Sequence, residues 1–187
     1  MFNYTVFAGF KIISQGNIEE VAIATKKYLK KEDDVRLLIF SDLSGKQMDL
    51  DLSGADKDVI DRLSVYKAAE ASVSVSGPGR PKIGVKPREV SLLPLHWEWL
   101  STQSGGASAT IRRLVDEKMK APTPKDKIKQ TQESVYTFLN SIAGDLTNFE
   151  DAIRFLYRQD EAKFKDAIAD WPKDLKKHTL TLSRGVF

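Results

Sequence analysis

The stretch from residue 4 to residue 29, YTVFAGFKIISQGNIEEVAIATKKYL, predicts how the fold begins. Two β-branched and aromatic runs, Tyr4–Phe7 and Phe10–Ser14, are separated by a glycine, which is typical of a β-hairpin. Asn17 with Glu20 three residues later has the form of a capping box, a common start of a helix. The apolar residues that follow recur at helical spacing. We therefore expect a hairpin that leads directly into an amphipathic helix.

The next segments repeat this alternation of strand and helix. The continuous apolar run Val35–Ser41 predicts a strand buried on both faces. From Met48 to Leu52 apolar residues alternate with aspartates, which indicates a half-exposed strand. Asp56–Val65 has the pattern of a short helix. We expect an α+β fold whose first domain, residues 1–67, is a ββαββα unit with a mainly antiparallel sheet.

The rest of the chain divides at two breaks. Residues 68–87 are small, polar and interrupted by Gly and Pro, which predicts a flexible basic linker or arm. Residues 88–120 then predict a strand at Glu89–Pro94 and two helices separated by a glycine turn. After a second break, residues 125–187 form a C-terminal helical region in which Thr147 and Glu150 suggest another capping box.

The composition excludes several classes of protein. The chain has 187 residues, 41% of them hydrophobic and 29% charged, as is ordinary for a globular protein. It contains no cysteine, which excludes disulfides, a thiolate nucleophile and cysteine-based zinc sites. The N-terminus has no secretory signal pattern, and no apolar run approaches the roughly 20 residues that span a bilayer. We expect a soluble cytoplasmic protein with no membrane partner.

The positive charge is concentrated in the middle of the chain. The formal net charge is +3. Residues 77–120 carry 8 basic and 4 acidic side chains, whereas residues 1–76 carry 10 and 12, and residues 121–187 carry 11 and 10. An approaching polyanion responds to such a local field more than to the total. The middle segment is therefore the place to look for nucleic-acid binding.

That segment begins with an arm whose cations are spaced by prolines. Arg80, Lys82, Lys86 and Arg88 alternate with prolines and glycines that disfavour helix and keep the backbone extended. An extended chain with a cation every few residues can follow the phosphates of a nucleic acid. The Gly-Arg-Pro at 79–81 resembles the centre of an AT-hook, whose arginine enters the minor groove of DNA. The alternative interpretation is a solvated basic linker.

Residues 88–120 have the order strand, helix, glycine turn, helix, and in this they resemble a ribbon–helix–helix DNA-binding module. In that family the strands of two chains pair into a ribbon that enters the major groove, so the resemblance implies a homodimer. Glu89, Ser91 and Leu93 would point outward from the strand. Only Ser91 suits that position, because readers of DNA bases are usually polar or basic there.

The second helix of this segment offers further contacts. The resemblance implies that the backbone around Ser108, at the helix N-terminus, binds a phosphate. Arg112 and Arg113 follow on the same helix as additional candidates. In the first helix Trp97 is expected to pack in a core or a dimer, and Trp99 to mark a partner surface.

The whole chain resembles a bacterial family known as domain of unknown function 2239. The resemblance implies no activity. It is carried by short stretches spread over most of the sequence: Phe7-Ala8-Gly9, Asp49-Leu50-Asp51-Leu52, Gly79-Arg80-Pro81-Lys82-Ile83-Gly84-Val85, Arg88-Glu89-Val90, His96-Trp97-Glu98-Trp99-Leu100 and Gly105-Gly106-Ala107-Ser108.

An enzyme active site finds little support in the sequence. The only histidines, His96 and His178, belong to no metal-binding motif, and the chain has no nucleophile-elbow, Walker or dinucleotide-binding pattern. Asp42, Asp49 and Asp51 could converge as a weak site for a hard metal ion. The simpler interpretation is that Asp49 and Asp51 face water on an alternating strand.

We therefore predict a non-enzymatic DNA-binding protein, with transcriptional regulation as its expected role and no cofactor. It would form a homodimer through residues 88–120. The main alternative is a protein-interaction or dimerisation module with no nucleic-acid role, and the carboxylate enzyme is the third. The predicted nucleic-acid-binding residues are Arg80, Lys82, Lys86, Arg88, Ser91, Ser108, Arg112 and Arg113.

Overall fold

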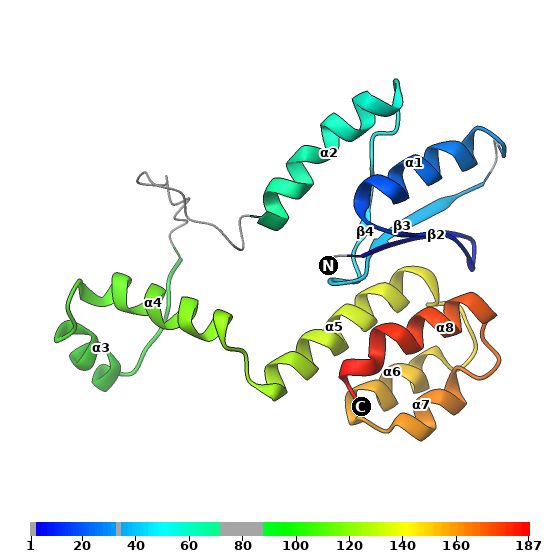
Figure 1. Cartoon of the computed structure of the whole chain (residues 1–187). Coiled ribbons are helices and arrows are strands. Elements are labelled where there is room, and N and C mark those ends of the chain that lie inside the picture. Colours follow the sequence, from blue (N-terminus) through cyan, green and yellow to red (C-terminus); the bar gives the residue numbers. More distant parts are fainter. Residues whose placement is uncertain (1–2, 33–34, 72–87) are drawn as a thin grey trace. The chain divides into compact units, whose positions relative to one another are not determined.

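The computed structural model describes residues 3–32, 35–71 and 88–187, and side chains are described outside 64–71 (Figure 1). The chain forms two compact units. The sheet unit consists of Met1–Val73 together with Lys127–Phe187, and the middle unit is Ser74–Asp126. The sheet unit is therefore built from both ends of the sequence, and each unit is described below by itself.

A four-stranded antiparallel sheet forms the centre of the sheet unit. Its strands are β1 (Tyr4–Ala8), β2 (Lys11–Gly16), β3 (Leu37–Ser41) and β4 (Gln47–Met48), in the order β2-β1-β3-β4. β1 and β2 form the hairpin expected from the sequence. With the helices that follow, this confirms the predicted ββαββα order and the α+β class.

Two helices belong to this order. α1 (Ile18–Leu29) begins at Asn17, whose side chain accepts from the backbone N–H of Glu19 and Glu20, while Glu20 Oε2 accepts from the Asn17 N–H at 3.0 Å. The predicted capping box is thus confirmed. α2 (Asp56–Ala71) is longer than the expected Asp56–Val65 and continues into the segment expected to be linker.

The fourth strand is shorter than the sequence pattern predicts. Strand pairing ends at Met48. The Asp51 carboxylate accepts hydrogen bonds from both the backbone N–H and the hydroxyl of Ser53, and this local turn takes the place of further hydrogen bonds between β3 and β4. Leu50 and Leu52 still pack against the apolar cluster under α1 and α2. The prediction from the alternating apolar residues was therefore correct about which side chains are buried and wrong about the length of the strand.

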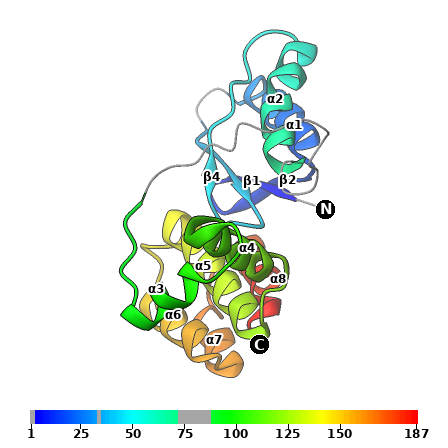
Figure 2. The same ribbon diagram turned by 90° about the vertical axis from the view of Figure 1, so that its left-hand side faces the viewer.

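Helices cover both faces of the sheet (Figures 1 and 2). Tyr4 and Val6 pack with α1 and α2 on one face, and Phe7 and Phe40 pack with the C-terminal helices on the other. This division follows from the period of two in strands. The Phe138 ring centroid lies 5.7 Å from that of Phe7 and 5.0 Å from that of Phe40, and full burial of each ring stabilises the fold by about 1.5–3 kcal/mol.

The C-terminal helices are α5 (Pro124–Ile142), α6 (Phe149–Arg158), α7 (Glu161–Ala167) and α8 (Lys173–Leu182), followed by a short 3₁₀ turn. The expected Thr147–Glu150 capping box is wrong. Asn148 precedes α6 with φ 64° and gives no side-chain cap, and the Thr147 carbonyl instead accepts from Trp171 Nε1 at 2.8 Å.

A close contact joins the β3–β4 turn to α5. Gly45 has φ 67°, and a Cβ at this position would overlap the carbonyl oxygen of Ser134 and lie 2.9 Å from the Phe138 nitrogen. The Ser134 hydroxyl donates to the Leu43 carbonyl at 2.8 Å. Glycine is needed here for the left-handed backbone and for the close approach. This contact fixes the turn against the helix on one side of the cavity described below.

The middle unit contains α3 (Pro94–Ser101) and α4 (Gly106–Lys120), joined by a turn in which Gly105 and Gly106 have φ of 85° and 74° (Figure 2). Residues 88–93 form no strand, so the predicted strand Glu89–Pro94 is wrong for the single chain. Pro94 instead occupies the first turn of α3, where its missing N–H costs nothing.

Candidate functional site

The predicted nucleic-acid contacts fall into three groups. Arg80, Lys82 and Lys86 lie outside the described residues. Arg88 and Ser91 lie in the segment that precedes α3, and both are exposed. Ser91 therefore occupies no strand face. The remaining contacts, Ser108, Arg112 and Arg113, are all exposed on α4.

The charged side chains of α4 differ in what surrounds them. Arg113 Nη1 lies 3.2 Å from Glu117 Oε1, so this guanidinium is already paired. Lys118 Nζ lies 2.8 Å from Asp126 Oδ2, and its hydrogen bond, with those from Thr123, holds the pKa of Asp126 far below its usual range. Arg112 forms no ion pair with any residue that the structure describes. Arg112 is thus the α4 arginine most open to a phosphate.

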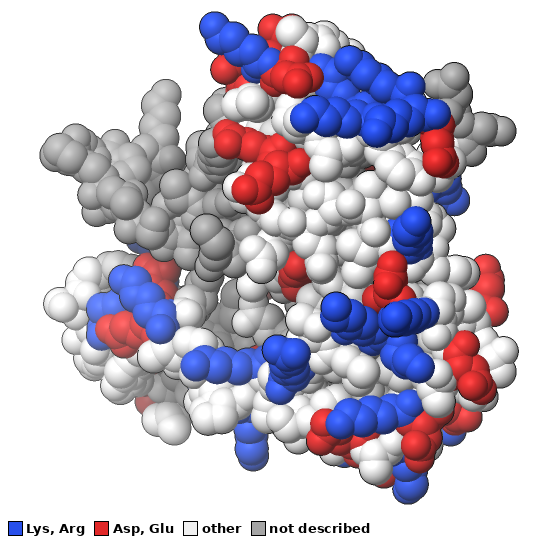
Figure 3. Space-filling view, turned by 45° about the vertical axis from the view of Figure 1, so that its right-hand side comes forward, with Lys and Arg blue, Asp and Glu red and all other residues white. Residues whose placement is uncertain are grey.

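Some cations of the sheet unit are paired with carboxylates, whereas others, such as Lys127 and Lys129, are exposed and have no ion pair among the described residues. Figure 3 shows basic side chains gathered at the top of the view, with basic and acidic side chains interspersed over its lower part. Lys26 Nζ lies 2.8 Å from Asp56 Oδ1, and Lys165 Nζ lies 2.7 Å from Glu161 Oε1. A phosphate would have to compete with these carboxylates for the ammonium groups.

The two helices of the middle unit expose an apolar surface. Leu100 is the only hydrophobic side chain that is buried among the described residues of this unit. Trp97 and Trp99 are 45% and 48% exposed, so Trp97 does not pack in a core. Eight large apolar side chains are exposed here: Val90, Leu93, Leu95, Trp97, Trp99, Leu114, Val115 and Met119.

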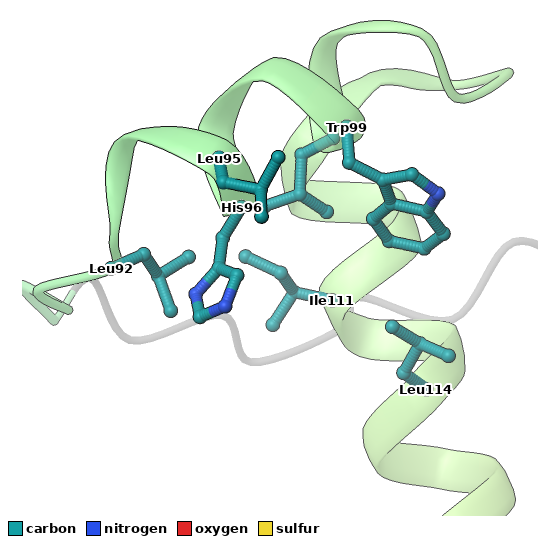
Figure 4. A pocket seen from close by; sticks show the side chains of 7 residues that line it. Leu92, Leu95, His96, Trp99, Ile111 and Leu114 are labelled. Atoms are coloured by element: carbon teal, nitrogen blue, oxygen red, sulfur yellow. The ribbon is translucent and has the colours of Figure 1, made fainter.

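Part of this surface is hollowed into a groove between α3 and α4. Its volume is about 540 Å³. In Figure 4 the lining side chains converge from the two helices and from Leu92, just before α3, and the only polar atoms of the labelled side chains are the ring nitrogens of His96 and Trp99. The labelled residues are Leu92, Leu95, His96, Trp99, Ile111 and Leu114. We call these residues and the eight exposed ones the apolar surface of the middle unit.

The three aspartates considered as a metal site do not come together. Among the described residues no group of three His, Cys, Asp or Glu side chains could hold a metal ion. Asp51 accepts hydrogen bonds from Ser53 and pairs with Arg62 at 3.3 Å, and these interactions lower its pKa, the Ser53 hydrogen bonds most strongly. Asp49 is exposed, and Asp42 belongs to a different network.

That network is a buried polar cluster between the sheet and α8. The Thr5 hydroxyl donates to Asp42 Oδ1 at 2.9 Å, and Gln15 Nε2 donates to Thr5 Oγ1 at 3.1 Å. Gln15 Nε2 also lies 3.3 Å from His178 Nδ1, and His178 Nε2 lies 3.3 Å from Asp42 Oδ1. The side chains of Thr5, Gln15, His178 and Asp42 thus form a closed ring of polar contacts.

The His178 imidazole is held tightly in this ring. Its side chain is 1% exposed, and its centroid lies 5.6 Å from the Phe7 ring and 5.1 Å from the Phe138 ring, both edge-on. Nε2 is close enough to Asp42 Oδ1 for an ion pair, but the geometry of the contact does not meet that of a hydrogen bond. The amide nitrogen of Gln15 can only donate a hydrogen bond, so His178 Nδ1 accepts it. In a neutral imidazole the proton therefore lies on Nε2, on the side of Asp42.

Sequence reasoning did not group these residues. Asp42 and His178 lie far apart in the chain, and no motif links them. The spacing of Leu175, His178, Thr179 and Leu182 places the histidine on the apolar stripe of α8, and this alone could have predicted its burial. Only the fold brings its partners to it.

Asp42 also lines a cavity of about 440 Å³. The other polar side chains of this cavity come from α5 and are Lys127, Gln130, Thr131 and Ser134. The Asp42 side chain is 17% exposed. Its Oδ1 atom lies in the buried ring, and the residue also lines the cavity.

Comparisons with known proteins place the chain in a family without adding a biochemical activity. Neither the curated proteins nor the solved structures contain a match. Within the described ranges, none of the helices has the length and apolar character needed to cross a membrane. The model of one family, described as an uncharacterized protein conserved in bacteria (DUF2239), matches residues 3–183. Since this match covers nearly the whole chain, the protein belongs to the DUF2239 family.

Proposed function

We propose that the protein is a non-enzymatic DNA-binding protein that acts as a homodimer, with a regulatory role in transcription. The apolar surface of the middle unit would hold the dimer together, and the basic residues around it would contact DNA. The observation that carries the proposal is this apolar surface, which lies in the one segment of the chain with a marked positive excess.

The apolar surface supports pairing because the two helices have almost no core of their own. With a single buried hydrophobic side chain, α3 and α4 gain little from packing on each other. Each leucine, valine or methionine that becomes fully buried on association stabilises the complex by about 1.5–3 kcal/mol. Monomers rarely leave so many large apolar side chains in water without a binding role.

A second copy is the occupant that fits best. Eight exposed side chains of on the order of 100 Å² each supply about the 800 Å² per partner that a standard interface buries. Residues 94–120 carry four basic and three acidic side chains, so two copies would hardly repel one another. Two helix pairs related by a two-fold axis can form a four-helix bundle with one shared core.

Charge supports DNA as the ligand. Pairing would bring two segments of +4 together, and the cations on each arm would then face the same polyanion. Arg88 and Arg112 are exposed, and the first turn of α4 near Ser108 carries no side-chain cap, so its backbone N–H groups are open to a phosphate. Arg80, Lys82 and Lys86 would supply the contacts of the arm.

The ribbon is a finer part of the same proposal. In the dimer, residues 89–93 of the two copies would pair with each other, because this extended segment has no strand partner among the described residues of its own chain. Ser91 would then occupy an outward position, and Arg113 would be freed for DNA only by leaving Glu117.

Salt dependence of DNA binding tests the proposal. Each phosphate neutralised contributes a slope of about −0.9 to log affinity against log salt. The double variant R80A/K82A should therefore bind random duplex more weakly and lose about 1.8 of slope per protomer. The variant K163A/K165A removes the same charge from α7 of the sheet unit and should change neither quantity.

A second candidate function follows from the apolar surface alone. The chain would then be an interaction module that dimerises without binding nucleic acid. A dimer that retains no duplex DNA at low salt, in fluorescence anisotropy, would support this function. Duplex binding that is unchanged in R80A/K82A would remove the arm from the proposal.

A further inference from the structure

The cavity beside Asp42 contains two opposite charges that do not pair with each other. Among the described residues, Asp42 makes its only ion pair with His178, and Lys127 makes none. Both side chains line the same cavity, yet no salt bridge within 4.0 Å joins them. A ligand that carries both signs can place its cation near Asp42 and its anion near Lys127.

The hydroxyl groups in the cavity favour a donor at the Asp42 end. The Thr131 hydroxyl already donates to the Lys127 carbonyl at 2.9 Å. The Ser134 hydroxyl hydrogen is directed to the carbonyls of Leu43 and Gln130, at 2.8 and 3.0 Å. Both oxygens can therefore offer only lone pairs to a ligand. Because Ser134 donates to the carbonyl of Leu43, the neighbour of Asp42, its oxygen and the carboxylate form an acceptor end of the cavity, and Thr131 adds a further acceptor to the lining.

The buried ring fixes the carboxylate of this acceptor end. Thr5 donates to Asp42 Oδ1, and His178 faces the same oxygen, so the side chain cannot rotate without breaking both interactions. A carboxylate held in this way loses little conformational entropy when it binds a cation. The ring therefore provides a preorganised acceptor, and His178 is a positioning residue.

We propose that this cavity binds a small zwitterion, an α-amino acid with an aliphatic side chain. Asp42 with the Thr131 and Ser134 oxygens receives the ammonium group, and Lys127 with the Gln130 amide receives the carboxylate. Leu43 and Leu182 provide apolar contact for the side chain. The volume of about 440 Å³ is in the range of small-molecule sites. This site is independent of the proposed DNA binding.

Three matched probes test the pairing of charges. L-leucine carries both groups, isoamylamine lacks the carboxylate, and 4-methylpentanoate lacks the ammonium. At ten times its Kd, L-leucine should raise the Tm of the full chain by about 3–6 °C in circular dichroism. The two single-charge probes should each give a clearly smaller shift at the same concentration.

Variants assign the shift to the cavity. D42N keeps the shape of the side chain and removes its charge, and K127Q removes the charge of an exposed side chain. Both should lose the response to L-leucine. D49N and K129Q change exposed residues outside the cavity and should keep it. A Tm unaffected by L-leucine overturns the proposal, and so does a response that survives in D42N and K127Q.

Discussion

Replacement of Leu95 by glutamine should dissociate the proposed dimer without unfolding the chain. Leu95 is 69% exposed in the single chain, so the substitution removes little packing from the monomer. Full burial of a leucine contributes about 1.5–3 kcal/mol. The part still available at this position is about two thirds of that, or about 1–2 kcal/mol.

Symmetry doubles this effect. In a two-fold interface each copy contributes the same residue, so L95Q should weaken association by about 2–4 kcal/mol. The dimer dissociation constant would then rise by about 30- to 1,000-fold. Sedimentation equilibrium at several concentrations measures both constants.

A matched substitution separates the interface from general surface effects. Leu29 is 37% exposed at the end of α1, in the sheet unit, and L29Q should leave the dissociation constant unchanged. An unmodified chain that is monomeric at tens of micromolar would contradict the proposed dimer. Equal dissociation constants for L95Q and L29Q would show that Leu95 does not lie in the interface.

Two further predictions concern the sheet unit. G45A should lower the free energy of unfolding by about 2–5 kcal/mol in urea, because a positive φ and an overlap with the Ser134 backbone add to one another; a change below about 1 kcal/mol would contradict this account. Burial and the hydrogen bond to Glu133 raise the pKa of Tyr157 to about 12, so its contribution to stability is complete below pH 10 and is lost as the pH rises toward 12. The stability of Y157F, measured by urea unfolding, should not show this decrease between pH 10 and 12. Its absorbance titration at the tyrosinate band should show one fewer tyrosine that ionises at high pH than the unmodified chain.

Elements with local sequence signals were the predictable part of the fold. Asn17 and Glu20 satisfy each other within four residues, so the start of α1 could be placed without any tertiary information. The hairpin of β1 and β2 is equally local. The strand expected at Glu89–Pro94 failed, because alternating apolar residues also suit an extended segment, and a strand needs a partner that the single chain does not provide.

Sites that depend on long-range contacts could not be predicted. Asp49 and Asp51 were considered as a metal site only because they are close in sequence. In the structure Asp51 accepts a hydrogen bond from Ser53 and forms an ion pair with Arg62 instead. The ring of Asp42 and His178 joins residues from β1, β2, the end of β3 and α8. No periodicity in the sequence indicates which of these side chains will meet.

The discontinuous sheet unit has a consequence for synthesis on the ribosome. Phe7 and Phe40 emerge early, whereas the helices that cover them begin more than eighty residues later. At about 5–20 residues per second, this side of the nascent sheet stays open to water for several seconds. During that time the nascent chain exposes the rings of Phe7 and Phe40, and chaperones that bind exposed apolar surfaces should raise its yield.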